Sequence, residues 1–162
     1  MKNINSKKIN IALIGCGRIS QKHILAIISE NKRCELVAIC DNNKERVENI
    51  YKFYEKKSKE KNIVFKDLYK FNDFEELINA KRNNKIIIDL IVLATPSGLH
   101  PKQTIIAAKS GINVCTEKPM AINVKDGREL LKISQRKKLY IGNAPDTFLG
   151  GGSQKSKELI ES

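Results

Sequence analysis

The chain has 162 residues, a net charge of +12 and a hydrophobic content of 41%. This length suits one domain with its own core, and no run of about 18 apolar residues predicts a membrane span. Its basic residues are mostly lysines spread along the sequence. They accompany no nucleic-acid-binding motif and no interleaved aromatic side chains, so binding of nucleic acid is the disfavoured interpretation of the charge. No apolar signal segment is recognised near the N-terminus, so a cytoplasmic location is expected.

Strands and helices are expected to alternate through the first half of the chain. Residues 9–15 form an apolar run that ends in glycine, which is typical of a strand buried on both faces. A helix, a buried strand ending on an acid, a polar helix and a short strand are then expected at 18–30, 35–41, 43–60 and 68–71. Asn72 or Asp73 can cap a further helix that runs to about residue 80.

The second half continues the alternation. Residues 86–94 form the strongest strand pattern, and a helix over 99–109 follows, ended by Gly111. A strand, a helix, a strand and a helix are then expected at 112–116, 123–137, 139–142 and 153–162. The side chains expected to face inward from the helix over 123–137 are Val124, Leu130, Leu131 and Ile133. This order predicts an α/β fold, a doubly wound parallel sheet with helices on both faces.

The four cysteines are Cys16, Cys34, Cys40 and Cys115. They form no Cys-x-x-Cys pair, and only His23 and His100 could add imidazole ligands. Zinc-site spacing is therefore absent, and no metal is expected. Reduced, mostly buried thiols are the prediction.

A glycine-rich turn joins the first expected strand to the first expected helix. Residues 15–20 read Gly-Cys-Gly-Arg-Ile-Ser, which matches Gly-x-Gly-x-x-Gly with serine in the last place. Gly15 permits the tight turn, and Gly17 has no Cβ, so a pyrophosphate can approach the backbone and the helix N-terminus. The predicted cofactor-binding residues here are Gly15, Cys16, Gly17, Arg18 and Ile19. The alternative is an ordinary turn between a strand and a helix.

An acid ends the second expected strand. Asp41 lies 24 residues after Gly17, where a carboxylate can accept both ribose hydroxyls of an adenosine half and repel a 2′-phosphate. NAD is therefore the predicted cofactor and is favoured over NADP. Arg46 lies too far into the next helix to overturn this prediction. The alternative for Asp41 is a cap for the helix over 43–60.

Polar residues also follow the expected strand over 86–94. Thr95 can hydrogen-bond a phosphate or a ribose, and Pro96 stiffens the turn. His100 could orient the cofactor or the substrate, with a helix-start histidine that takes no part in catalysis as the alternative. This loop is expected at the ligand-binding edge of the sheet.

These motifs resemble the glucose–fructose oxidoreductase and inositol dehydrogenase family (Gfo/Idh/MocA). The stretches that carry the resemblance are Gly-Cys-Gly-Arg-Ile-Ser at 15–20, Ala-Ile-Cys-Asp at 38–41, Ala-Thr-Pro-Ser-Gly-Leu-His at 94–100 and Thr-Glu-Lys-Pro-Met at 116–120. The resemblance implies that Glu117 contacts the nicotinamide-side ribose. It also implies that Lys118 is catalytic, beside the nicotinamide and the reacting carbinol during hydride transfer. The alternative is a surface Glu-Lys pair before a proline.

The substrate branch stays open at this stage. The 94–100 and 116–120 stretches are most similar to dehydrogenases that oxidise a ring hydroxyl of UDP-linked amino sugars, whereas residues 144–152 resemble a different branch. A sugar, cyclitol or nucleotide sugar is therefore the implied substrate class.

The family has a second, substrate-binding domain whose aspartate–histidine pair has no counterpart here, because no histidine follows His100. We expect a cofactor-binding domain over 1–145 and the start of that second domain over 146–162, where Asp146 and Thr147 point towards the active-site edge. Little dehydrogenase activity is expected of the 162-residue chain. The alternative function is a non-catalytic NAD-binding fragment that docks on a partner. The apolar residues near the C-terminus are expected to fray or to bind a second copy of the chain, and they are Phe148, Leu149, Leu159 and Ile160.

Overall fold

Six strands form one parallel sheet in the computed structural model, which describes residues 8–143 and 150–161. The strands are β1 Ile9–Ile14, β2 Cys34–Cys40, β3 Tyr69–Phe71, β4 Leu90–Leu93, β5 Asn113–Thr116 and β6 Ile141–Asn143. They lie in the order β3-β2-β1-β4-β5-β6, and every neighbouring pair is parallel. The chain thus runs outward from β1 to β3 and returns at β4 on the other side of β1. This reversal creates a topological switch point between β1 and β4, which is where such sheets bind ligands.

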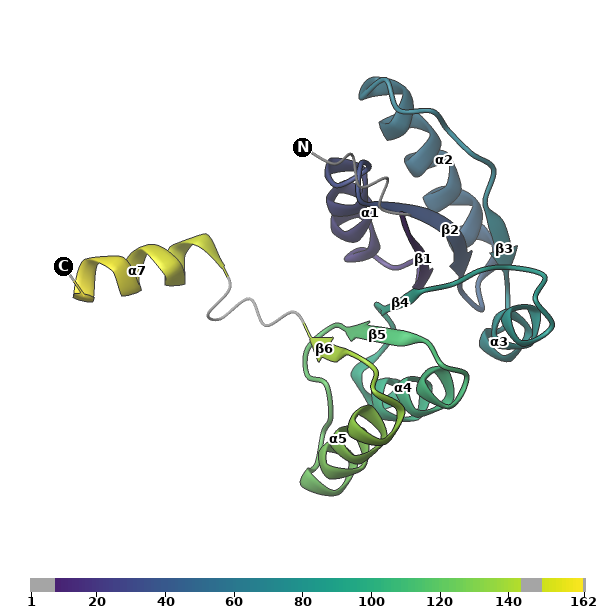
Figure 1. Ribbon diagram of the computed structural model, residues 1–162. Coiled ribbons are helices and arrows are strands. Elements are labelled where there is room, and N and C mark those ends of the chain that lie inside the picture. Colours follow the sequence, from purple (N-terminus) through teal and green to yellow (C-terminus); the bar gives the residue numbers. More distant parts are fainter. Residues whose placement is uncertain (1–7, 144–149, 162) are drawn as a thin grey trace, which may run out of the picture.

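Helices cover both faces of the sheet (Figure 1). The helices packed on the sheet are α1 Ser20–Ser29, α2 Lys44–Glu60, α3 Phe74–Arg82, α4 His100–Lys109 and α5 Val124–Lys137, with a 3₁₀ turn η1 at Ser97–Leu99. Helix α7, Gly151–Glu161, lies apart from the sheet. One apolar cluster joins α1 and α2 to the sheet, and a second joins α3 and α4 to its opposite face. The predicted doubly wound α/β fold is confirmed.

Burial on both faces explains the apolar composition of β1. Ile11 and Leu13 belong to the cluster that contains α1 and α2. Ala12 and Ile14, which alternate with them, belong to the cluster that contains α3 and α4. Because neither face of a central parallel strand meets water, no polar residue is favoured at alternate positions.

Three helices begin with a side-chain cap. The side chains of Asn43, Asp73 and Asn123 accept the amide N–H three residues ahead, at 3.1, 2.9 and 2.9 Å, at the starts of α2, α3 and α5. Of the two capping residues predicted for α3, Asp73 is therefore the one used. The N-termini of α1 and α4 have no side-chain cap. These two helices follow β1 and β4, the strands that flank the switch point.

Strand β4 is shorter than the predicted run over 86–94. Its ladder with β1 begins at Leu90, paired with Ile11, and Asp89 N donates to Asn10 O at 2.9 Å. Residues 86–88 are not part of any strand. Ile86 and Ile88 are nevertheless buried in the core, so their apolar character reflects packing without sheet pairing.

The inward face of α5 was predicted too broadly. Leu130 and Ile133 are buried, but Val124 and Leu131 are 69% and 58% exposed. The helix packs beside α4 and β6, at the edge of the sheet. Only a narrow stripe of an edge helix reaches the core. Leu131, one residue and about 100° around the helix from Leu130, lies outside that stripe.

The C-terminal segment is helical, as expected, and all residues of α7 are exposed. The predictions made for Asp146, Thr147, Phe148 and Leu149 lie outside the described residues. Among residues 8–143 and 150–161, no helix is both long enough and apolar enough to cross a membrane. The same residues contain no group of three or more histidine, cysteine or acidic side chains suited to a metal ion.

Candidate functional site: a cofactor cleft at the switch point

Backbone hydrogen bonds continue the sheet by one residue beyond the carboxyl ends of its strands. Gly15 N donates to Cys40 O at 2.8 Å, and Ala94 N donates to Ile14 O at 2.7 Å. Glu117 N donates to Leu93 O at 2.8 Å. The glycine-rich loop, the loop after β4 and the Glu117 loop are therefore brought to one edge of the sheet, although they come from distant parts of the sequence.

A cleft of about 540 Å³ opens at this edge. The predicted site residues that line it are Gly15, Gly17, Arg18, Ile19, Asp41, Thr95 and Pro96. The cleft is also lined by residues that sequence reasoning did not select, among them Asn42, Arg46, Asn72, Phe74, Leu99 and Gln103. Cys16, His100, Glu117 and Lys118 do not line it. Of the eleven predicted residues, seven thus line the cleft and four do not.

The two glycines of the turn are needed for different reasons. Gly15 has φ +94°, and a Cβ there would lie 2.5 Å from Ala94 O and 2.6 Å from Ala94 C. Gly15 therefore allows the turn and the close approach of the loop after β4. A Cβ on Gly17 would meet no atom within 4 Å. No protein atom demands a glycine at position 17, which leaves room for a ligand against the backbone.

The start of α1 is suited to an anion. Ser20, in the place of the third glycine, is fully buried and donates its hydroxyl to Gly17 O. In the described chain, the amides of Gly17, Arg18 and Ile19 have no hydrogen-bond acceptor. Unpaired amides at an uncapped helix N-terminus carry partial positive charge and bind phosphate groups.

Asp41 is a buried carboxylate beside the cleft. Its Oδ2 accepts the amide of Cys16 at 2.8 Å, and its Oδ1 accepts the amide of Asn43 at 2.9 Å. Asn43, and not Asp41, caps α2, so the capping alternative for Asp41 is wrong. Each carboxylate oxygen retains a further lone pair for a ligand hydroxyl. The same side chain therefore ties the glycine-rich loop to the end of β2.

The thiols near the site are unreactive by environment. Burial, with the Asp41 charge as a second cause, raises the pKa of Cys16 to about 12. Burial likewise raises the pKa of Cys40 to about 12. Because the thiolate is the nucleophilic form, the Cys16 thiol is not a nucleophile here. Cys16 acts at the site through its backbone amide, which donates to Asp41. All four cysteines are free, and Cys115 alone is only partly buried, so the predicted burial of most thiols is confirmed.

The loop after β4 fixes its own polar groups. Thr95 donates its hydroxyl proton to Gln103 Oε1 at 2.6 Å. With that proton committed, the hydroxyl can only accept from a ligand, which suits a ribose hydroxyl better than a phosphate. Pro96 is extended, with φ −56° and ψ 139°, and directs the chain into η1.

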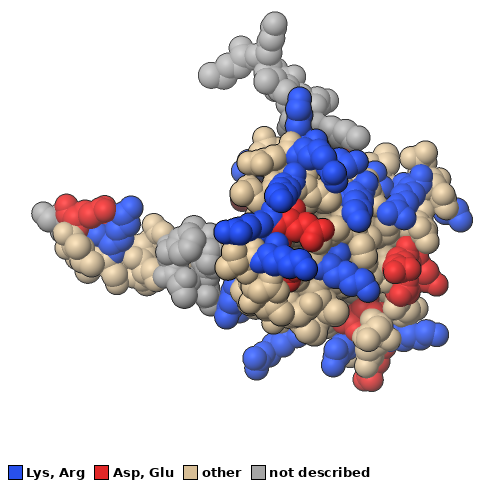
Figure 2. Space-filling model, turned by 90° about the horizontal axis from the view of Figure 1, so that it is seen from below, with Lys and Arg blue, Asp and Glu red and all other residues tan. Residues whose placement is uncertain are grey.

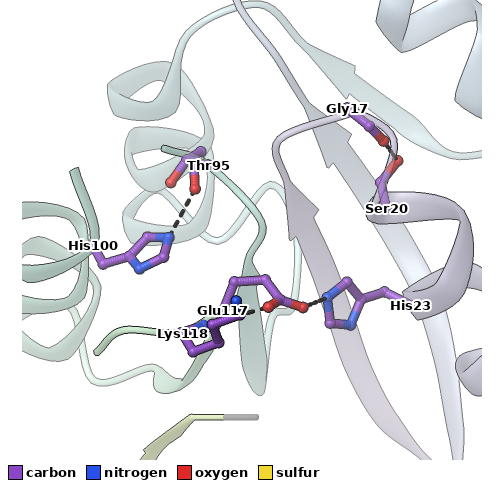
Figure 3. A network of polar contacts seen from close by, with 7 residues as sticks. All are labelled: Gly17, Ser20, His23, Thr95, His100, Glu117 and Lys118. Carbon is purple, nitrogen blue, oxygen red and sulfur yellow. Dashed lines mark hydrogen bonds and ion pairs between the residues drawn. The ribbon is translucent and has the colours of Figure 1, made fainter. Parts of the chain in front are cut away.

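His100 joins two loops from a buried position. It is 1% exposed, and its Nε2 and Nδ1 lie 2.8 Å from Thr95 O and from Pro119 O. Both ring nitrogens are thus directed at backbone carbonyls, and the ring joins the loops after β4 and β5. Figure 3 shows the contact with Thr95. In this arrangement it acts on a ligand through the backbone that it holds.

Glu117 and Lys118 lie beside each other at the end of β5, with different partners. Glu117 Oε1 lies 2.8 Å from Nε2 of His23, a residue of α1 (Figure 3). Lys118 is exposed, and its ammonium has no ion-pair partner in the described chain. Sequence reasoning missed His23, considering it only as a zinc ligand.

Positive charge is spread over the surface. Figure 2 shows lysine and arginine side chains scattered across one face, with acidic side chains among them. Several lysines of the described chain form ion pairs with glutamates, including Lys57, Lys59, Lys66 and Lys70. On this face the charge does not form the continuous stripe expected of a nucleic-acid-binding surface.

The strand order, the glycine-rich turn with its unpaired amides and the acid at the end of β2 together define a dinucleotide-binding α/β domain. The profile of the GFO_IDH_MocA family, described as an oxidoreductase family with an NAD-binding Rossmann fold, matches residues 9–143. The chain belongs to this family and is an NAD-binding Rossmann domain. The resemblance found in the sequence is confirmed.

Solved and curated relatives give the same picture. The chain is similar to the WlbA dehydrogenase from Bordetella pertussis in complex with NADH and UDP-GlcNAcA, with 33% identity and a TM-score of 0.78. It is also similar to the WlbA dehydrogenase from Chromobacterium violaceum with the same ligands, with 27% identity and a TM-score of 0.79. It is 28% identical over 126 residues to glucose-6-phosphate 3-dehydrogenase from Bacillus subtilis.

These relatives are longer than this chain. The match to the Bordetella and Chromobacterium proteins covers 96% and 98% of this chain but 42% and 41% of theirs. The match to the Bacillus protein covers 78% of this chain and 30% of that protein. The chain therefore spans less than half the length of each.

Proposed function

We propose that this chain is the cofactor-binding part of an oxidoreductase that transfers hydride between NAD and a ring hydroxyl of a sugar, cyclitol or nucleotide sugar. The observation that carries the proposal is the cleft between β1 and β4. It combines the unpaired amides of Gly17, Arg18 and Ile19 with the carboxylate of Asp41. The names of the relatives, which include a glucose-6-phosphate 3-dehydrogenase and complexes with UDP-GlcNAcA, support this substrate class.

The residues of the cleft fit NAD. The amides at the start of α1 would hold the pyrophosphate, and the open space over Gly17 admits it. The remaining lone pairs of Asp41 would accept the ribose hydroxyls of the adenosine half. A fixed, buried carboxylate would also repel a 2′-phosphate, so we propose that NAD is preferred to NADP. Arg18 and Arg46 line the same cleft and are the residues that could weaken this preference.

The remaining residues would act at the nicotinamide end. NAD supplies the hydride acceptor at this end when it is bound. Thr95 would accept a hydrogen bond from ribose, and Glu117 would accept one from the nicotinamide-side ribose. Lys118 would place its ammonium near the alcohol oxygen, where a cation stabilises the negative charge that develops on that oxygen as hydride leaves the carbinol carbon for NAD. The hydroxyl proton would pass to solvent. Lys118 is thus the proposed catalytic residue.

Calorimetric titration with NADH and NADPH tests the cofactor assignment. We expect NADH to bind more tightly, and we expect Asp41→Asn to narrow the difference because it removes the charge while keeping the shape. Asp67→Asn is the matched control, since Asp67 is exposed, bonds Tyr51 and does not line the cleft. Equal affinities in the wild type, or tighter binding of NADPH, would overturn the role of Asp41.

Turnover of a panel of sugars, cyclitols and UDP-sugars with NAD tests the catalytic assignment, in the natural protein that carries this chain. Lys118→Ala is expected to lower the rate about a hundredfold or more and to leave NADH affinity nearly unchanged. Lys125→Ala, an exposed lysine of α5, controls for the loss of surface charge. A Lys118→Ala variant that turns over like the wild type would exclude Lys118 from the chemistry.

A second candidate is an NAD-binding module without chemistry of its own that docks on a partner. The observation that favours it is α7, where Leu159 and Ile160 are 66% and 84% exposed. Exposed apolar side chains of this kind favour association with a partner or a second copy. This candidate predicts NADH binding without turnover of any member of the panel, together with a molecular mass in solution that rises with protein concentration.

A cytoplasmic location stays a prediction.

A further inference from the structure

His23 connects the first helix to the far side of the cofactor edge. It lies one turn into α1, and its ring is 94 residues away in sequence from Glu117. The contact of 2.8 Å joins His23 Nε2 to Glu117 Oε1, and the two side chains are 18% and 19% exposed. Two partly buried groups of this kind are screened from water better than the surface pairs of this chain, so the contact restrains both side chains.

Glu117 is held at three points, one on its backbone and two on its carboxylate. Its backbone amide is bonded to Leu93 O at 2.8 Å, its Oε1 meets His23, and its Oε2 accepts the amide of Lys118 at 3.3 Å. The end of β5 thus fixes the backbone position of Glu117, and His23 fixes the position of its carboxylate. Each oxygen still has an unused lone pair for a ligand hydroxyl.

This pairing also decides what Lys118 can do. A glutamate next to a lysine can neutralise it by forming an ion pair, but here the glutamate faces α1 and its imidazole (Figure 3). Within the described residues, Lys118 Nζ has no ion pair or hydrogen bond. The neighbouring carboxylate therefore leaves the ammonium available to another group.

The contact does not require a charged histidine. A neutral ring with its proton on Nε2 donates to the carboxylate, and a doubly protonated ring donates from the same nitrogen. His100 differs, because both of its nitrogens face backbone carbonyls. Of the two histidines, His23 is the one that orients a side chain which can reach a ligand.

We propose that His23 is a positioning residue for cofactor binding: it aims the Glu117 carboxylate at the nicotinamide half of the dinucleotide and keeps it away from Lys118. The inference rests on the proposed function, in which Glu117 meets the nicotinamide-side ribose. It assigns His23 no contact with the adenosine half. Loss of His23 should therefore weaken binding of the whole dinucleotide and spare binding of its ADP portion.

The test compares NADH with ADP, which lacks the nicotinamide riboside, by calorimetric titration of the full chain. We expect His23→Ala to weaken NADH about tenfold, the usual effect of losing a charge-assisted hydrogen bond, and to leave ADP affinity unchanged. His23→Gln should restore NADH binding because its amide can donate to Glu117 from nearly the place of Nε2, whereas the shorter His23→Asn should not.

A double-mutant cycle separates positioning from a direct contact. If His23 acts through Glu117, His23→Ala should have no effect on NADH affinity in a Glu117→Ala background. An effect that persists in that background would overturn the proposal, and so would equal weakening of NADH and ADP, which indicates general damage to the fold. Wild-type affinity for NADH in His23→Ala would overturn it as well. A wild-type chain that binds ADP and NADH equally would instead contradict the nicotinamide-side contact of the proposed function.

Discussion

A pair of alanine substitutions in the glycine-rich turn separates folding from binding. At Gly15 the backbone has φ +94°, which costs an L-residue about 1–2 kcal/mol. The new Cβ would also lie 2.5 Å from Ala94 O and 2.9 Å from Thr95 N, atoms that cannot rotate away. Forcing such a group into a packed site costs about 1–3 kcal/mol more. We therefore expect Gly15→Ala to lower the free energy of unfolding by about 3 kcal/mol.

Gly17→Ala should behave in the opposite way. Its Cβ would meet no atom within 4 Å and its φ is not in the left-handed region, so the free energy of unfolding should change by less than about 0.5 kcal/mol. The methyl group would, however, stand where the pyrophosphate approaches the amides of Arg18 and Ile19. We expect NADH affinity to fall steeply in Gly17→Ala and to vanish in Gly17→Val.

Thermal unfolding followed by circular dichroism, together with calorimetric titration of NADH, measures both effects. For a chain of this size 3 kcal/mol corresponds to a decrease in Tm of about 10 °C. A Gly15→Ala variant with the wild-type Tm would refute the close approach of the loop after β4. A Gly17→Val variant that binds NADH like the wild type would refute the placement of the pyrophosphate.

Two further predictions concern the scaffold. Asp73→Ala should destabilise the protein by about 1 kcal/mol, because it removes the side chain that accepts the amide of Glu76 at the start of α3. Denaturant unfolding measures this loss, and Asp73→Asn should recover most of it. Cys16 and Cys40, whose pKa values burial raises to about 12, should resist iodoacetamide at pH 8 in the folded protein and react once it is unfolded. Rapid native alkylation at either position, read by mass spectrometry, would contradict their burial.

Features that depend on local sequence were predicted well. The alternation of apolar runs and capped helices predicts the α/β class, and the glycine-rich turn before α1 predicts the binding edge. Asp73 is recognisable as a cap because its signal lies within one helical turn. The position of Asp41 at the end of a buried strand correctly predicts that it lies at the carboxyl edge of the sheet, where the cleft opens.

Features that depend on tertiary neighbours were not predictable in the same way. Whether Leu131 is buried depends on which neighbours flank α5, and the sequence of the helix does not contain that information. The bonds of Asp41 to the amides of Cys16 and Asn43 depend on how two loops meet. His23 was missed because its partner, Glu117, comes from another strand, and a histidine in a helix has no local signature for such a contact.

Chemical-shift mapping of the ¹⁵N-labelled chain during titration with NAD is the most direct test of the central claim that this cleft binds the dinucleotide. The largest changes are expected at the amides of Gly17, Arg18 and Ile19, with further changes at Glu117 and Lys118 at the end of β5. The smaller cavity of about 270 Å³, lined by Asn62, Ile63 and Val64, serves as the internal control and should not respond. Changes centred on that cavity, or no change at saturating NAD, would contradict the account.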